Sequence, residues 1–135
     1  MDASVILRNA LAQPGAIRQL GDHGPGIASD LVELECLRTL DRLRLAGAIP
    51  EEHLAVARRR TLEWIAPLSR VLVDSVVLEL AARPHSTPLG TLDAIHLATA
   101  ILWRETRDRD VIMATHDRAL GTAARAFGLE VIGLS

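Results

Sequence analysis

The chain has 135 residues, of which 49% are hydrophobic and only 2% aromatic, and these values predict one domain with an aliphatic core. No apolar run approaches the roughly 18 residues of a membrane span, and there is no basic and apolar leader, so we expect a soluble protein of the cytoplasm with no membrane partner. The net charge is −2, which disfavours non-specific coating of nucleic acid but is compatible with a nuclease whose acids gather around a metal.

Turn residues and apolar periodicity divide the first half of the chain into short elements. In order we expect a turn at Asp2, a helix over residues 4–12, a short helix over 16–20, a loop over 21–26, a strand over 27–29, a helix that Ser29 caps and Gly47 ends, a helix over 50–61 and a strand over 62–68.

The second half continues the alternation of strands and helices. We expect a helix that opens at Ser69 or Asp74 and runs through Ala82, a loop over 83–90, a helix over 91–104, a charged turn over 107–110, a strand over 111–115, a helix that Asp117 caps and Gly128 closes, and a last strand over 130–133. This order predicts an α/β sandwich with a mainly parallel sheet flanked by helices.

Residues 91–100 are the most informative stretch of the sequence. Thr91 is placed to cap a helix, and Asp93 falls in its first turn, where the helix dipole favours an ionised carboxylate. The residues that follow are apolar and predict a buried helix. Taken alone, Asp93 is interpreted as an ordinary acid at a helix N-terminus, and it becomes a site residue only if other acids join it.

Three further acids lie near strand ends, where sites form in parallel sheets. Asp2 is at the first junction, Asp117 directly follows the strand over 111–115, and Glu35 is in the helix that follows the strand over 27–29. Several carboxylates in one place do not stay ionised together without a cation. Mg²⁺ and Mn²⁺ prefer such oxygen ligands and activate water for attack on phosphorus.

The chain resembles the PIN-domain ribonucleases of the VapC toxin kind over nearly its whole length. The stretch Leu92-Asp93-Ala94-Ile95-His96-Leu97-Ala98 is the most specific part of the resemblance. The other stretches are residues 2–5, residues 28–31 with 35–38, residues 115–120 and residues 123–129.

The resemblance implies a Rossmann-like PIN fold, homodimers, and RNA cleavage that depends on Mg²⁺ or Mn²⁺. It implies that Asp2, Glu35, Asp93 and Asp117 are the catalytic and metal-binding acids. Ser4 and Thr115 would support them through hydrogen bonds, and Arg38 would lie near Glu35. It also implies an antitoxin partner whose C-terminal segment wraps the toxin and inhibits it.

The chain departs from this family at its start. The family has several apolar residues before its first acid, and these form its first and central strand, whereas here Met1 alone precedes Asp2. We therefore expect residues 1–135 to form a single PIN-like domain with a truncated first strand. Asp2 would be the least well anchored of the four acids.

Several residues have two interpretations. Glu33 competes with Glu35 but points the other way on its helix, and the spacing of Arg38 favours Glu35. Asp30 is interpreted as a first-turn acid, and Cys36 as a buried small side chain. His96 either touches the site or is packed and hydrogen-bonded, and we favour the second.

For two further groups of residues we favour a structural role over a functional one. Trp64 and Trp103 are expected in the core or at a dimer contact rather than as platforms for bases, and residues 58–60, all Arg, as a solvated face rather than a contact for RNA phosphate.

Two other functions compete with the nuclease. A catalytically silent PIN-like module would bind RNA or an antitoxin without cutting. A phosphatase of the haloacid-dehalogenase type built around Asp2 would need a second Asp at position 4, where this chain has Ser4.

Overall fold

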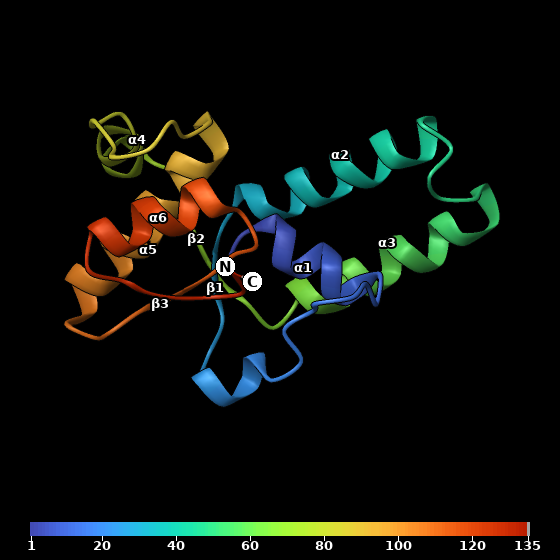
Figure 1. Cartoon of the computed structure of the whole chain (residues 1–135), viewed down its shortest axis with the longest axis horizontal. Helices are drawn as coiled ribbons and strands as arrows, with labels where there is room; N and C mark the ends of the chain where they lie inside the picture. Colours follow the sequence, from blue (N-terminus) through green and yellow to red (C-terminus); the bar gives the residue numbers. More distant parts are fainter. Residues whose placement is uncertain (135) are drawn as a thin grey trace.

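The computed structural model describes residues 1–134 and consists of six α-helices around two pairs of short strands (Figure 1). In chain order the elements are α1 (Ala3–Ala10), a 3-10 helix (Leu20–His23), β1 (Ile27–Ser29), α2 (Leu31–Leu45), α3 (Glu51–Ile65), β2 (Ser69–Val71), α4 (Ser75–Ala81), α5 (Thr91–Arg107), β3 (Ile112–Ala114), α6 (Arg118–Ala126) and β4 (Glu130–Ile132). None of the helices within residues 1–134 is long and apolar enough to cross a membrane.

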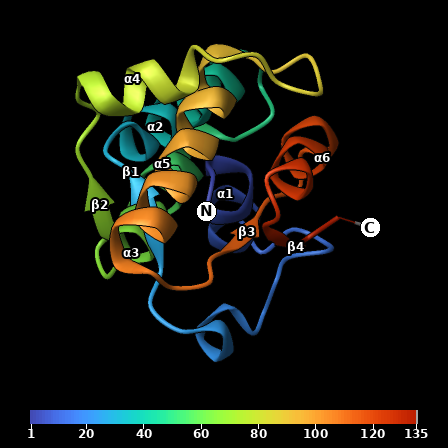
Figure 2. The same ribbon diagram turned by 90° about the vertical axis from the view of Figure 1, so that its left-hand side faces the viewer.

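The strands pair in parallel, as predicted, but they form two sheets rather than one. In one sheet β1 pairs with β2, with Ile27 opposite Ser69, and in the other β3 pairs with β4, with Ile112 opposite Glu130. The start of the chain lies between the two pairs (Figure 2). The Met1 nitrogen donates to the Ile27 carbonyl oxygen at 3.1 Å, and the Asp2 amide donates to the Ala114 carbonyl oxygen at 3.4 Å. The first two residues therefore connect the sheets.

The core is aliphatic and lies in three clusters. The first cluster joins α1, β1, α2 and α3 around Ile6, Val32 and Leu40. The second joins α5, β3 and α6 around Leu97, Met113 and Leu120, and the third packs α4 on α5 through Val77 and Ile95. Helix α5 belongs to two clusters because its residues from Ala94 to Ile101 are buried on every side. It is the rigid element on which Asp93 stands.

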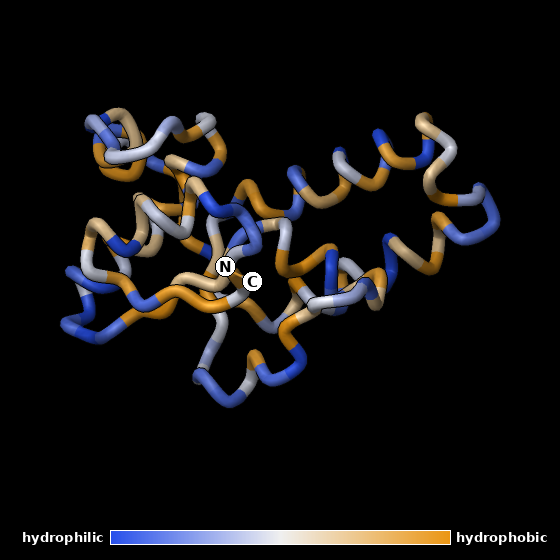
Figure 3. The backbone as a smooth tube through the Cα atoms, in the orientation of Figure 1, coloured by the Kyte–Doolittle hydropathy of each residue, from blue (hydrophilic) through white to orange (hydrophobic). Residues whose placement is uncertain are grey.

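Helices α2 and α3 form a hairpin that projects from the rest of the molecule (Figure 1). Gly47 ends α2 with a φ of +74°, a conformation that favours glycine, and Pro50 is the N-cap residue of α3. Polar and apolar residues alternate along both helices (Figure 3), and their buried residues recur at helical spacing. Residues 58–60 lie on the solvent side of α3 and are exposed, which agrees with the solvated interpretation of this Arg run.

Four expectations about secondary structure were wrong. Asp30, not Ser29, is the N-cap residue of α2. Residues 62–65 continue α3, because Thr61 and Ile65 extend the buried stripe that begins at Ala57, and the strand starts later, at Ser69. Residues 16–20 form no α-helix, and the only helical turn near them is the 3-10 helix. Gly90, not Thr91, is the N-cap residue of α5, so Thr91 is already helical.

Candidate active site

Asp2 is held by three hydrogen bonds. It is the N-cap residue of α1, and its Oδ1 accepts from the Val5 amide at 3.4 Å and from the Ser4 hydroxyl at 2.6 Å. Its Oδ2 accepts from the Thr115 hydroxyl at 2.8 Å. The residue is only 4% exposed, and a buried carboxylate needs such donors. Asp2 is therefore well anchored, although only Met1 precedes it.

Thr115 connects Asp2 to Asp117. The Thr115 side chain directly follows β3 and is fully buried, and its hydroxyl oxygen also accepts from the Asp117 amide at 3.0 Å. Asp117 is the N-cap residue of α6, as predicted, and its Oδ1 accepts from the Leu120 amide at 2.8 Å. The Ser4 hydroxyl accepts from the His116 amide at 3.1 Å. Ser4 and Thr115 thus fasten the start of the chain to the end of β3, in the supporting positions that the resemblance implied.

Glu35 reaches the same region from α2, but with a partner that the sequence did not predict. Its Oε2 lies 2.6 Å from Nε2 of His96, whose side chain is 1% exposed. Arg38, expected beside Glu35, instead forms an ion pair with Asp41 at 3.0 Å on the solvent face of α2. Glu33, the acid that competed with Glu35 for a place in the site, instead forms an ion pair with Arg70 at 2.6 Å. Of these two acids, Glu35 is the one that faces α5.

Asp93 stands in the first turn of α5, as predicted, but its carboxylate is not stabilised there. Burial, followed by the charges of Asp117, Asp2 and Glu35, raises its pKa to about 6, while His96 acts in the opposite direction. The pKa lies above the ordinary value because of burial and like charge, yet a pKa of about 6 leaves the carboxylate mostly ionised at pH 7. The same interactions show that all four acids lie within electrostatic reach of one another.

These four carboxylates match the ligands that a hard divalent cation prefers. Among residues 1–134, no group of three or more Asp, Glu, His or Cys side chains is already arranged so that it could hold a metal ion. The donor set nevertheless fits a cation, because Asp93 accepts no hydrogen bond from any described residue and is surrounded by three like charges. A cation among these acids would offset their repulsion and lower the pKa of Asp93.

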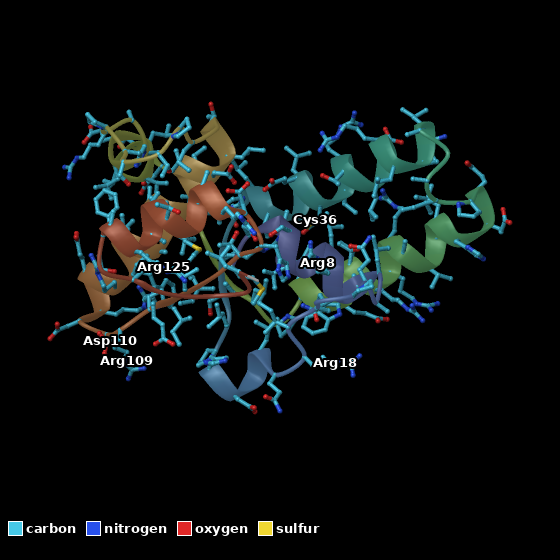
Figure 4. All side chains as sticks on the ribbon, viewed as in Figure 1. Arg8, Arg18, Cys36, Arg109, Asp110 and Arg125 are labelled. Atoms are coloured by element: carbon cyan, nitrogen blue, oxygen red, sulfur yellow. The ribbon has the colours of Figure 1, made fainter. Side chains whose placement is uncertain are left out.

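The remaining candidates have structural surroundings. Asp30 is the exposed N-cap residue of α2, and Cys36 lies buried between α1 and α2, with a pKa that burial raises to about 12 (Figure 4). Trp64 packs at the edge of the first core cluster, while Trp103 is half-buried with the Arg107 guanidinium 3.4 Å from its ring centre. His96 is packed and hydrogen-bonded, as favoured, but its partner is Glu35, so it also touches the site. The three-residue spacing from Asp93 to His96 was the available signal, since it places both on one face of the helix.

A comparison with protein families agrees with this architecture. Residues 1–125 match the model of the PIN domain, so the chain belongs to the PIN domain family. Among curated proteins, Ribonuclease VapC46 of Mycobacterium tuberculosis (strain ATCC 25618 / H37Rv) is 34% identical to the chain over 142 aligned positions. These positions take in all of this chain and 96% of the relative.

Proposed function

We propose that the protein is a metal-dependent endoribonuclease and the toxin of a toxin–antitoxin pair, acting in the cytoplasm. Family membership and a full-length relative named as a ribonuclease support this activity. The observation that supports the metal dependence is the arrangement around Asp93, where burial and then the charges of three acids from distant segments raise its pKa to about 6. An arrangement of uncompensated acids is typical of a site that binds a cation.

Mg²⁺ or Mn²⁺ would be held by Asp2, Glu35, Asp93 and Asp117. When bound, such an ion supplies an activated water and offsets the charge that develops on the scissile phosphate. The chain itself provides preorganised acids. Ser4 and Thr115 orient Asp2, the first turn of α6 orients Asp117, and the buried body of α5 holds Asp93. Because these side chains are oriented before the ion and the RNA arrive, little reorganisation is needed during the reaction.

The partners follow from the same proposal. The substrate is RNA, held mainly by arginine side chains, because the chain has few aromatic residues on which bases could stack. A cognate antitoxin protein inhibits the site, and the toxin acts as a homodimer. We give Arg38 only a minor supporting role, since its guanidinium binds Asp41.

Cleavage of an RNA pool that includes tRNA tests the activity. The wild-type protein is expected to cleave with Mn²⁺ and not with EDTA, and Asp93→Asn is expected to lose cleavage. Glu33→Gln, on the same preparation route, is the matched control and should cleave normally because Glu33 pairs with Arg70 outside the site. Equal cleavage by wild type and Asp93→Asn would assign the activity to a contaminant and remove the enzyme proposal.

Metal binding in the absence of RNA distinguishes the nuclease from the alternative, a catalytically silent PIN-like module. A ligand that binds only the folded state raises its melting temperature. A working site should therefore melt at a higher temperature with Mn²⁺ than with EDTA, and Asp93→Asn should lose this difference. A wild-type protein that shows neither cleavage nor a Mn²⁺ effect on melting would be a binding module.

A further inference from the structure

The contact between Glu35 of α2 and His96 of α5 joins an acid that reaches solvent to a ring that does not. Oε2 of Glu35 lies 2.6 Å from Nε2 of His96, across 61 positions of the chain. The side chain of Glu35 is 20% exposed, whereas that of His96 is 1% exposed. A cation that enters from solvent can therefore reach the carboxylate, while the imidazole stays shielded from it.

The chemistry of the two groups fixes the direction of this hydrogen bond. An ionised carboxylate has no hydrogen to donate, so Nε2 of His96 donates and Oε2 of Glu35 accepts. The second carboxylate oxygen, Oε1, accepts no hydrogen bond from any residue within 1–134. The contact thus uses one oxygen of Glu35 and leaves the other for a further partner.

Glu35 depends on another element for its orientation. Asp2 and Asp117 each accept from an amide in the first turn of the helix that they cap. Glu35 lies in the second turn of α2, beyond the amides that a helix leaves free at its start. Its side chain has more rotamers, so it loses more conformational entropy when it is fixed. Since Arg38 forms its ion pair elsewhere on α2, the group that orients Glu35 among the described residues is His96.

The second nitrogen of His96 argues against a purely structural role. Nδ1 is buried and has no hydrogen-bond partner in the described part of the chain. A buried polar atom without a partner costs stability, and a leucine would fill a similar space without that cost. Packing alone therefore does not account for the imidazole, whereas the hydrogen bond from Nε2 to Glu35 does.

A separate, apolar contact holds the same two helices together. Leu31, one turn before Glu35, packs on the core cluster that contains Ile95 and Ala98 of α5. Residues of α5 from Ala94 to Ile101 are buried on every side, so one substitution leaves the helix in place. Loss of the polar contact should therefore change the direction of the Glu35 carboxylate more than it changes the fold.

His96 also stands beside a second acid of the site. It follows Asp93 by three residues, which places both on one face of α5. The charges of Glu35 and His96 act on the pKa of Asp93 in opposite directions, so the three groups lie within electrostatic reach of one another. The carboxylate that His96 holds is therefore the one that α2 brings to Asp93.

We propose that His96 is a positioning residue for the cation: its Nε2–H holds Oε2 of Glu35, and Oε1 is left to bind the ion beside Asp93. This inference rests on the proposed function. Hydrogen-bond partners of metal ligands typically change metal affinity by about 10–100-fold when they are removed. His96 acts through Glu35 and does not itself contact the ion.

Direct binding of Mn²⁺, followed by the electron paramagnetic resonance signal of the unbound ion, tests this role without RNA. His96→Leu removes the donor, keeps an apolar side chain of similar bulk, and should weaken Mn²⁺ binding about tenfold. His96→Gln keeps a terminal N–H and should stay within about threefold of wild type. Thr99→Val is the control in the next turn of α5, because its buried hydroxyl bonds only the Ile95 carbonyl, and it should bind Mn²⁺ as wild type does.

A double-mutant cycle distinguishes action through Glu35 from a general disturbance of the site. In a Glu35→Gln background, His96→Leu should weaken Mn²⁺ binding by less than about twofold more, because the carboxylate that it orients is gone. In an Asp117→Asn background, which keeps a side chain able to cap α6, the tenfold loss should persist.

The outcomes separate this role from the nuclease itself. Equal Mn²⁺ affinities of wild type and His96→Leu, or a tenfold loss that persists in the Glu35→Gln background, would overturn the positioning role and leave the nuclease intact. If His96→Leu does not fold, His96→Asn replaces it with the same expected loss, because its shorter amide does not reach Glu35. A wild-type protein that binds no Mn²⁺ would remove the proposed function and this role with it.

Discussion

Asp2 and Asp93 are both acids of one site, yet their surroundings are opposite. Asp2 is buried and accepts hydrogen bonds from Ser4, Val5 and Thr115. Asp93 is half-buried, accepts no hydrogen bond from any described residue, and has a pKa that burial and three like charges raise to about 6. The protein satisfies one carboxylate completely and leaves the other uncompensated.

This difference separates two tasks within one cluster. A carboxylate with its donors in place keeps its orientation and holds the start of the chain against β3. A carboxylate without donors destabilises the metal-free protein and gains most from a cation. Glu35 and Asp117 are intermediate, since each has one hydrogen-bond partner among the described residues, His96 for Glu35 and the Leu120 amide for Asp117. Four predictions test this division, beginning with the largest expected effect.

The largest effect is expected for Glu35→Gln, and Glu33→Gln on the same helix is its control. Glu35→Gln removes a charge that faces Asp93 and should lower Mn²⁺-dependent RNA cleavage by about a hundredfold or more. Glu33→Gln breaks only a half-exposed ion pair with Arg70, so its rate should stay within about twofold of wild type. Initial cleavage rates at saturating Mn²⁺ measure both. Similar losses in the two variants would show that the wrong acid of α2 has been chosen.

The second prediction concerns the satisfied side of the site. Thr115→Val keeps the side-chain shape but removes the donor to Asp2 and the acceptor of the Asp117 amide. Hydrogen bonds to charged groups contribute about 1.5–3 kcal/mol, so the free energy of unfolding should fall by about 2 kcal/mol. Urea unfolding without metal gives this value. Thr99→Val is the control, because its buried hydroxyl bonds only the Ile95 carbonyl within α5. A loss no larger than that of the control would mean that Asp2 does not need Thr115.

The third prediction concerns the uncompensated side. Asp93→Asn removes the charge that its neighbours repel, so the metal-free variant should be more stable than wild type at pH 7.5, by about 1 kcal/mol after allowance for solvent screening. The sign of the pH dependence follows from the raised pKa. An acid whose folded pKa is raised destabilises the protein above that pKa, and the penalty falls away as the pH drops from the folded value of about 6 to the ordinary value of 3.8.

Wild type should therefore gain stability from this group between pH 7.5 and about pH 4, mostly below pH 6, and the variant should lack this gain. Urea unfolding at the two pH values, with EDTA present, measures the difference. If Asp93→Asn is less stable than wild type at pH 7.5, the carboxylate is compensated by a contact that the comparison with Asp2 overlooks.

Much of this arrangement follows from local sequence rules. Asp74 and Asp117 cap helices and Gly128 ends one, because these features depend on neighbouring residues alone. The four acids were also predicted from their places after strands and from the family resemblance. The partners of these acids were not predictable, because they depend on how helices pack. Glu35 finds His96 only because α2 lies against α5, and Arg38 finds Asp41 instead of Glu35 within a single helix face.

Arg38 provides the smallest expected effect and a limit on what the family resemblance implies. Its guanidinium is mostly exposed and binds Asp41, which also binds Arg44 at 2.9 Å, so Asp41 keeps a cationic partner when Arg38 is removed. Exposed ion pairs contribute about 0–1 kcal/mol. Arg38→Ala should therefore change the free energy of unfolding by less than about 0.5 kcal/mol, and it should leave the Mn²⁺ effect on melting intact. A weaker Mn²⁺ effect would show that Arg38 turns to Glu35 when the site is loaded, and the acids would then depend on a cation from the chain itself.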